Sequence, residues 1–342
     1  MQKKCFILFL SIIFLSCRKD IIIENTPENV FLTFWKIMDE NYVYFQEKNL
    51  DWDSIFNVYY PQAKAVTNEK ELHGIFSEII PLFKDGHVGI SCHLPGEFYS
   101  DISYHFRDDD ESIQYRDNPF DTIPSMEKLG FVEHKKNTYY QYKHKNYSLI
   151  TVFFSEPMTD LISYLNYLDY RDGLILDLTR STGGKSNNVY DITSLFFTGE
   201  KIVGYKQNKT GKGHNDFTGK IPVFLEGKNI IPENVPVVVL TGPYTFSAGN
   251  IFSYIMKELP NCIIIGKKTG GGGGARCEAL LPNGWVLSYP FYKYFNAQQE
   301  NTEFSLMPDI YVTKKNEDNE NITHITDVIA RAIEVLDSIN GF

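Results

Sequence analysis

Two strand patterns flank a helical pattern between residues 235 and 266. The run 237–240 is apolar and mostly β-branched, which predicts a fully buried strand, and residues 262–265 predict a second strand. Between them, apolar residues recur at helical spacing up to Pro260, namely Ile251, Phe252, Ile255, Met256 and Leu259. This strand–loop–helix–strand order predicts two parallel strands in one sheet.

A second unit of the same kind precedes it. Residues 147–154 predict a strand, 158–168 a helix, 173–178 a buried strand and 189–196 another helix. In open α/β sheets the loops at the carboxyl ends of the strands form the edge where ligands bind. The loops after the two buried strands are therefore the first place to look for chemistry.

The N-terminal third has the helical pattern alone. Three amphipathic segments begin at Thr26, Asp51 and Asn68, which are favourable cap residues. Pro61 is expected to interrupt or end the second segment, and Pro81 to kink or end the third. Three short amphipathic helices predict a small helical subdomain.

The remaining segments are less regular. Residues 93–146 predict short strands and loops, in which the acidic run 108–111 is a solvated loop. Residues 285–294 alternate apolar and polar positions and predict a strand. A final amphipathic helix is expected over 323–339, with Gly341 after it.

The first residues have the pattern of an export signal. Lys3 and Lys4 precede the apolar run 6–15, which is too short for a convincing transmembrane helix. The run ends in Leu15-Ser16-Cys17, which resembles a bacterial lipoprotein cleavage box with Cys17 as the lipidated residue. The alternative is an ordinary secretory signal or an anchor. We expect an exported, membrane-anchored lipoprotein on the periplasmic side of an outer membrane or on the cell surface.

These patterns divide the chain into five parts. We expect a signal peptide at 1–16, a tether at 17–26, the helical subdomain at 27–92, the irregular segment at 93–146 and an α/β core at 147–342.

Composition excludes some functions. The formal net charge is −10 and no basic patch stands out, which argues against a nucleic-acid partner. Beyond Cys17, three cysteines remain without CxxC spacing, namely Cys92, Cys262 and Cys277. This pattern predicts neither a disulfide framework nor a metal site, and nothing calls for a cofactor. The sequence does not set the oligomeric state.

Ser247 lies at the start of the helix that follows the first buried strand. The N-terminus of a helix leaves backbone N–H groups unpaired and carries positive potential. A serine there can attack a carbonyl group while neighbouring N–H groups hold the developing oxyanion. Serine is also a preferred helix cap, and this stretch alone favours the cap.

Four further features are open to two interpretations. His87 lies in a tight glycine-flanked loop, as a surface histidine or as a general base. Gly183 and Gly184 either bring N–H groups close to a bound group or only form a turn. Residues 270–274 are a flexible loop or a phosphate cradle, although GxxxxGK[ST] is absent. Glu303 is either functional or a solvated loop carboxylate.

Taken together, the motifs resemble the tail-specific, or C-terminal processing, serine protease family, which includes the tricorn core protease and the interphotoreceptor retinoid-binding protein. The resemblance implies a crotonase/ClpP-like α/β core of repeated ββα units. Many members carry a PDZ domain after the helical segment, but this chain has no carboxylate-binding glycine-rich motif there, and we expect none. The matching segments occur in family order: Asp85-Gly86-His87, 147–154, 173–184, 235–250, 266–274 and 303–312.

The resemblance also implies roles for single residues. Ser247 corresponds to the nucleophile. The N–H of Ala248, with that of Gly183 or Gly184, corresponds to the oxyanion hole.

Two branches of the family differ in the general base. The Ser/Lys branch has its lysine at the position of Gly272, and Lys268 is out of that register. In the tricorn-like branch, His87 corresponds to the base and Glu303 to the acid, whereas the second serine of that branch falls at Gly86. The resemblance therefore favours a Ser–His–Glu relay.

The implied function is a serine-type endopeptidase that cuts unfolded proteins or peptides outside the cytoplasm. A second hypothesis is a non-catalytic lipoprotein that binds peptides or an apolar ligand in the same cleft. A third, an enzyme acting on acyl thioesters, conflicts with the export signal because coenzyme A substrates are cytoplasmic.

Overall fold

The computed structural model describes residues 24–94, 100–103, 113–114, 123–136, 138–155, 159–313 and 323–342 of the 342-residue chain. The predicted signal peptide, Cys17 and the acidic run 108–111 lie outside the described residues. Within the described ranges, no helix is both long and apolar enough to cross a bilayer.

The three N-terminal helices form as predicted. They are α1 (Pro27–Asn41), α2 (Trp52–Ala65) and α3 (Glu69–Ile79). The side chains of Thr26 and Asn68 cap α1 and α3, because each accepts a hydrogen bond from the backbone N–H three residues on.

The two prolines have different effects. The expectation that Pro61 interrupts or ends its helix is wrong, because α2 continues to Ala65. The helix loses one backbone hydrogen bond there, and Asn57, whose carbonyl would have accepted it, is exposed to water. Pro81 does end its helix, and the chain continues as a 3-10 turn, η1 (Ile80–Phe83).

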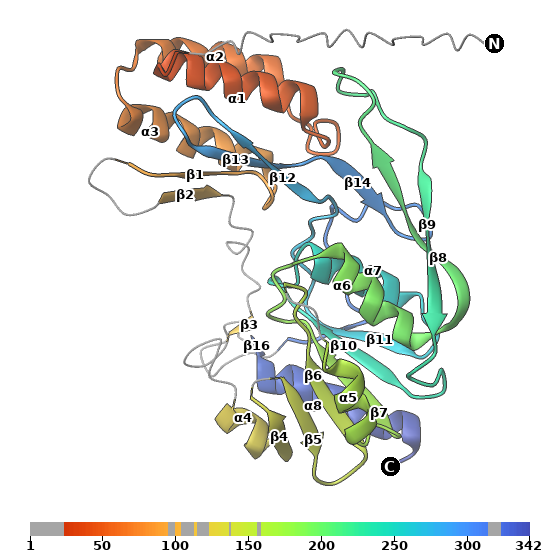
Figure 1. The fold of residues 1–342 in the computed structure, drawn as a ribbon. Helices are drawn as coiled ribbons and strands as arrows, with labels where there is room; N and C mark the ends of the chain where they lie inside the picture. Colours follow the sequence, from red (N-terminus) through yellow and green to blue (C-terminus); the bar gives the residue numbers. More distant parts are fainter. Residues whose placement is uncertain are drawn as a thin grey trace, which may run out of the picture.

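The helices pack on a small antiparallel sheet to form what we call the N-terminal subdomain (Figure 1). The sheet order is β12-β13-β1-β2. Two of its strands, β1 (Gly89–Cys92) and β2 (Ser100–Ser103), follow the helices in sequence, whereas β12 (Arg276–Leu280) and β13 (Val286–Pro290) return from the C-terminal part of the chain. Trp285 and Leu287 are buried against the helices.

The core is built on a seven-stranded sheet. Its five strands from β6 to β15 are parallel, and β5 and β4 extend one edge in antiparallel pairing. The strand order is β15 (Ile310–Tyr311), β11 (Cys262–Gly266), β10 (Val237–Thr241), β7 (Gly173–Asp177), β6 (Tyr147–Thr151), β5 (Tyr139–Tyr142) and β4 (Phe131–Lys135).

Helices cover both faces of this sheet. Val237 and Val239 of β10 face α5 (Leu161–Tyr167), α6 (Ser186–Thr193) and α7 (Ala248–Lys257). The alternate residues, Val238 and Leu240, face the other layer, which contains α4 (Ile123–Lys128) and α8 (Ile325–Asn340). Burial on both faces explains why β10 reads as a continuous apolar run.

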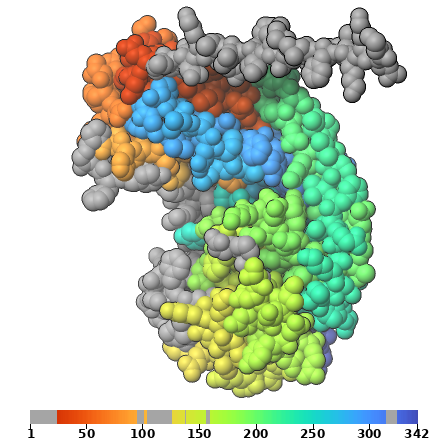
Figure 2. Space-filling view, viewed as in Figure 1, coloured from red at the N-terminus to blue at the C-terminus, as the bar shows by residue number. Residues whose placement is uncertain are grey.

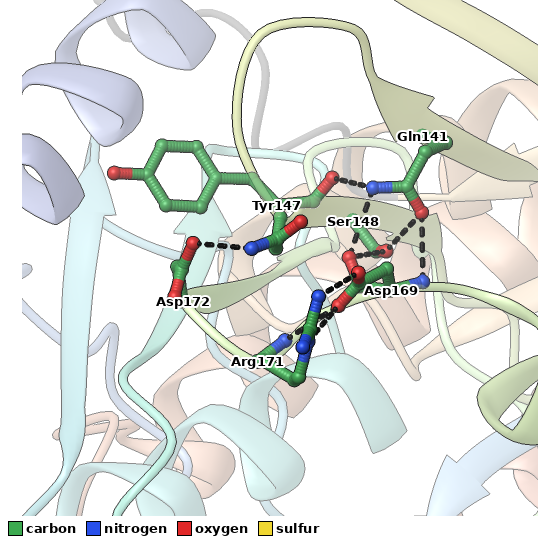
Figure 3. A network of polar contacts seen from close by, with 7 residues as sticks. Gln141, Tyr147, Ser148, Asp169, Arg171 and Asp172 are labelled. Atoms are coloured by element: carbon green, nitrogen blue, oxygen red, sulfur yellow. Dashed lines mark hydrogen bonds and ion pairs between the residues drawn. The ribbon is translucent and has the colours of Figure 1, made fainter.

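A polar network joins β5 and β6 to the loop that enters β7 (Figure 3). The side-chain amide of Gln141 donates to the backbone oxygens of Tyr147 and Asp169, both at 2.9 Å. Its oxygen accepts from the Ser148 hydroxyl and from the Asp169 N–H. All four hydrogen-bonding positions of this amide are thus filled, which fixes β5 against β6.

A long hairpin links the core to the N-terminal subdomain. Its two strands are β8 (Thr198–Asn208) and β9 (Ile221–Lys228). The 3-10 turn η2 (Ser194–Phe196) precedes β8. On its other side, β8 pairs with β14 (Tyr292–Phe295). The tip of the hairpin lies beside α1 in Figure 1, where His214 contacts Asp39 at 2.9 Å. The predicted strand 285–294 is thus divided between β13 and β14, which belong to different sheets.

The predicted fold class, an α/β core with a small N-terminal helical subdomain, is confirmed. Between β1 and β6 the described residues form α4 and short strands, of which β3 (Ile113–Gln114) pairs with β16 (Thr323–His324). No PDZ domain is found among those described residues.

The helix packing can be tested at Phe34, which is fully buried and contacts the rings of Trp52 and Phe76. We expect Phe34→Ala to lower the free energy of unfolding by about 3–5 kcal/mol, because it removes apolar contact and leaves a cavity. Val58→Ala, on the 56% exposed side chain of α2, should change it by less than about 0.5 kcal/mol. Equal effects of the two changes in urea denaturation would contradict this packing.

Candidate active site

Ser247 occupies a sharp turn between β10 and α7. Its backbone has φ 54° and ψ −113°, a conformation that costs a non-glycine residue about 1–3 kcal/mol. The surrounding loop holds it there, because Thr245 hydrogen-bonds to Leu178 O and the Phe246 N–H to Ser181 O. The Ser247 hydroxyl makes no capping hydrogen bond to α7, so the cap interpretation does not hold.

Gly183 lies against this serine. A Cβ atom placed on Gly183 would be 3.0 Å from the Cβ of Ser247, whereas one on Gly184 would be 2.1 Å from the carbonyl carbon of Phe154. Ala248 is the first residue of α7, where backbone N–H groups have no intrahelical acceptor. The three residues proposed for the oxyanion hole are thus brought to one place, and Gly183 is the glycine that borders the serine.

The hydroxyl of Ser247 contacts His87, which is 160 residues away in sequence. The distance from His87 Nε2 to Ser247 Oγ is 2.9 Å. The histidine is buried rather than on the surface, and its ring lies 4.7 Å from the ring of Phe246. A buried imidazole at this distance from a serine hydroxyl can accept its proton.

The turn that carries His87 is fixed by the preceding acid. Asp85 is buried, and its Oδ1 accepts the backbone N–H of His87 at 2.8 Å. Its Oδ2 accepts the hydroxyl of Tyr42 at 3.0 Å. Asp85 was named from the sequence only as part of the Asp85-Gly86-His87 motif and without a role, although an aspartate two residues before a histidine in a glycine turn is a signal for this side-chain-to-backbone bond.

Glu303 is buried behind the histidine, so the solvated-loop interpretation does not hold. Its Oε1 lies 2.7 Å from Nζ of Lys48, and its Oε2 accepts the Gly273 N–H at 3.0 Å. Asp85, His87 and Glu303 each place one atom within 4.8 Å of the others. Among the described residues, Nδ1 of His87 has no hydrogen-bond partner.

The glycine run 270–274 hydrogen-bonds both to the turn that carries Ser247 and to the loop that carries Glu303. The N–H groups of Gly272 and Gly273 bind the backbone and side-chain oxygens of Glu303, and the carbonyl of Gly271 accepts the Ser247 N–H. Gly271 has φ 78°, and a Cβ there would lie 2.5 Å from the Glu303 carbonyl. The run therefore connects the Ser247 turn to Glu303 through hydrogen bonds. Because its N–H groups are used in this way, the phosphate-cradle interpretation does not hold.

Burial and charge set the proton affinities. Burial lowers the pKa of His87, and the Asp85 carboxylate only partly offsets this effect. Burial and the Asp85 charge raise the pKa of Glu303 to about 8, outweighing the opposite effect of Lys48 and the Gly273 N–H. The imidazole is thus neutral at neutral pH, while Glu303 titrates at about pH 8.

The same three residues could hold a metal ion by residue type and spacing. Lys48 argues against that role, because its ammonium is already 2.7 Å from Glu303 and would repel a second cation. Nε2 of His87 is also engaged with the serine. The cluster is better suited to a proton relay than to metal binding.

Ser247 and His87 open onto a cleft of about 970 Å³. Its walls come from both parts of the molecule: Asp101 and Arg276 from the N-terminal subdomain, and Lys185 and Tyr244 from the core. Figure 2 shows this face hollowed between the blue strands of the N-terminal subdomain and the green and yellow core. A cleft of this size can hold an extended peptide segment.

Lysine does not take the place of the base. Residue 272 is glycine, and the side chain of Lys267 is buried 5.6 Å from the Tyr311 ring. The lysine among the described cleft-lining residues is Lys185, which lies at the start of α6. The contact found at Ser247 is that with His87.

Comparison with known proteins finds two matching family models. A model of peptidase family S41 matches residues 147–312, and one of the tricorn protease C1 domain matches residues 23–80. The two matches support a tail-specific, tricorn-like serine protease family for this chain. The predicted family is thereby confirmed, and it is a family of peptidases.

The chain is also similar to single proteins and to solved structures. A carboxyl-terminal-processing protease from Picosynechococcus sp. is 25% identical over 175 residues, which cover 49% of this chain and 39% of that protein. The structure of a candidate peptidase from Parabacteroides merdae has a TM-score of 0.76 at 29% identity, and covers 92% of this chain and 97% of that one. A photosystem II D1 C-terminal processing protease shares the fold, with a TM-score of 0.51 at 12% identity and coverage of 84% and 94%.

The chain spans about two fifths or less of the length of the curated relatives that it matches.

The strain at Ser247 gives a prediction. Replacing Ser247 by alanine keeps the unfavourable φ, whereas glycine relieves it, and both changes remove the bond to His87. We expect Ser247→Gly to be more stable than Ser247→Ala by about 1 kcal/mol, because relief of the strain exceeds the entropy cost of glycine. Urea denaturation of both variants measures the difference. An alanine variant as stable as the glycine variant would show that the turn is not strained.

Proposed function

We propose that this S41 member is a serine endopeptidase that hydrolyses peptide bonds of unfolded proteins or peptides outside the cytoplasm. Ser247 is the nucleophile, His87 the general base and Glu303 the acid of the relay. The observation that carries the proposal is the 2.9 Å contact between His87 Nε2 and Ser247 Oγ. It joins a nucleophile to a base whose ring is neutral at neutral pH.

The proposed reaction begins with attack of Ser247 Oγ on the scissile carbonyl carbon. The hydroxyl proton passes to Nε2 of His87, and the carbonyl oxygen becomes an oxyanion. The N–H groups of Ala248 and of Gly183 or Gly184 are proposed to bind that oxyanion. Because Gly183 borders Ser247 while Gly184 packs on Phe154, Gly183 is the better placed of the two glycines.

Breakdown of the tetrahedral intermediate follows from the same residues. The imidazolium of His87 returns its proton to the leaving amine, and the C–N bond breaks to give an acyl group on Ser247. Water then attacks this ester with His87 again as the base, which releases the second product and restores the serine. The buried carboxylates of Asp85 and Glu303 stabilise the imidazolium in both halves of the cycle.

Orientation of the histidine requires its proton on Nδ1, because Nε2 must be free to accept. Nδ1 is buried, and the ring lies in the group formed with the Asp85 and Glu303 carboxylates. Their negative charge favours the Nδ1–H tautomer and the later imidazolium. Gly86 occupies the place of the family's second serine, so that hydroxyl does not contribute here.

The test is cleavage of an unfolded protein, with products identified by mass spectrometry. We expect Ser247→Ala and His87→Ala each to lower kcat/KM by at least about 10³-fold, because each breaks the relay. Lys268→Ala is the control and should retain wild-type cleavage. Loss of cleavage in Lys268→Ala but not in His87→Ala would restore the lysine mechanism. Absence of cleavage by folded wild-type protein would favour the non-catalytic binding hypothesis.

We also propose that Cys17 is lipidated and anchors the chain to a membrane, on the periplasmic side of an outer membrane or at the cell surface. The support is the order of Lys3 and Lys4, the apolar run 6–15 and the cleavage-box pattern. One acyl chain gives weak binding, and stable anchoring takes more than one.

Metabolic labelling with a radioactive fatty acid tests this anchor. We expect label in the wild-type chain and in Cys277→Ser, and none in Cys17→Ser, which should also move from the membrane fraction to the soluble fraction. Label that persists in Cys17→Ser would place the lipid elsewhere and contradict the assignment.

A further inference from the structure

The turn between α1 and α2 reaches from the N-terminal subdomain into the proposed relay. Tyr42 donates its hydroxyl hydrogen bond to Asp85, and Lys48 forms the ion pair with Glu303. Glu47, between them, pairs with Lys293 of β14 at 2.5 Å. Two side chains of this turn, Tyr42 and Lys48, thus contact the carboxylates beside His87, and Glu47 ties the same turn to β14.

Lys48 contacts both loops of the relay. Its Nζ lies 2.7 Å from Glu303 Oε1 and donates to the backbone oxygen of Lys84 at 2.8 Å. Lys84 directly precedes the Asp85-Gly86-His87 turn. The ammonium also lies 5.9 Å from the centre of the Phe304 ring. With 12% of its side chain exposed, Lys48 is a bridge between the histidine loop and the glutamate loop.

The charges around the imidazole explain why a cation is needed there. Asp85 and Glu303 are two buried carboxylates within 4.8 Å of each other and of the histidine, so they repel one another. Lys48 balances one of them, which leaves one negative charge opposite the ring. Arg276 also acts on His87, but more than half of its side chain is exposed and it pairs with Glu278.

Resting on the function proposed above, we propose that Lys48 is a positioning residue of the relay. It holds Glu303 beside His87 and favours the ionised form of that carboxylate, whose negative charge in turn favours the Nδ1–H tautomer of the imidazole and the imidazolium. The N-terminal subdomain thereby supplies a charge on which the histidine of the site depends.

Loss of Lys48 has a defined consequence. The remaining groups that face Glu303 are the Asp85 carboxylate, which raises its pKa, and the Gly273 N–H, which lowers it. Without the ammonium the pKa of Glu303 rises further above about 8. A neutral Glu303 can donate to Nδ1 of His87, which places the ring proton on Nε2 and stops it from accepting the Ser247 proton.

The tyrosines beside Glu303 do not change protonation state in the pH range in which Glu303 titrates. Burial, reinforced by the two carboxylates, raises the pKa values of Tyr42 and Tyr44 well above their ordinary range, so both stay neutral where Glu303 titrates. Burial lowers the pKa of His87, and Arg276 and Lys48 act in the same direction against Asp85. Removing Lys48 therefore raises the proton affinity of both Glu303 and His87, and both effects move activity to higher pH.

The experiment measures kcat and KM of the full-length protein in detergent between about pH 5 and about pH 10, with an unfolded protein substrate. In the wild type, kcat/KM should rise with pH through about 8 as Glu303 ionises. In Lys48→Met this rise should move up by about one to three pH units, with a lower kcat at neutral pH and an unchanged KM. Lys48→Arg, which keeps the charge, should restore the wild-type position.

Lys293→Met is the matched control. It removes a buried lysine that pairs with Glu47 of the same turn, but it leaves Glu303 and His87 untouched. Thermal unfolding of both variants checks that each is folded. We expect Lys293→Met to lower stability without moving the pH profile. Equal profiles for Lys48→Met and wild type, or equal shifts in Lys48→Met and Lys293→Met, would overturn the proposal.

A second readout needs no turnover. The ¹⁵N chemical shifts of the His87 ring in Ser247→Ala protein report which nitrogen carries the proton. At about pH 9, above the pKa of about 8 of Glu303, we expect the proton on Nδ1 with Lys48 present and on Nε2 in the Ser247→Ala, Lys48→Met double variant. The same tautomer in both would overturn the role of Lys48. Absence of cleavage by wild type, with the tautomer change observed, would instead contradict the proposed protease activity alone.

Discussion

The structure depends on the burial of one carboxylate, that of Glu303. A buried charge costs several kcal/mol unless it is paired and hydrogen-bonded. Here the partners come from two directions: Lys48 from the N-terminal subdomain and the Gly273 N–H from the glycine run of the core. Because both partners bind the same carboxylate, the contacts of Glu303 hold its own loop against two others. Lys48 connects it to the histidine loop, and the glycine run connects it to the serine turn.

The parallel sheet provides the second constraint. β7 and β10 are adjacent, so the loops at their carboxyl ends meet, and this brings Gly183 against Ser247. The strained backbone of Ser247 is supported by hydrogen bonds to Ser181 and Gly271 on either side. The serine hydroxyl is consequently directed toward His87 rather than back to the helix that it precedes.

Much of this arrangement was accessible from the sequence, because local patterns determine local structure. The apolar runs predicted the buried parallel strands, and the cap residues Thr26 and Asn68 predicted helix starts. The residues of the proposed relay were identified through a resemblance in motif order, since one serine, one histidine and one glutamate carry little information alone. Pro61 was misjudged because an exposed helix tolerates the loss of one hydrogen bond to solvent.

The sequence by itself determined the strands, the helices and the candidate nucleophile, base and acid, because these follow from periodicity and short motifs. Only the tertiary structure decided how they meet. It paired β13 with β1, and it placed Lys48 and Asp85 beside Glu303 and His87. It also showed that the N–H groups of Gly272 and Gly273 bind oxygens of Glu303. These contacts join residues that are far apart in the chain. They are required because each buried charge must be paired or hydrogen-bonded, and burial is a property of the folded chain alone.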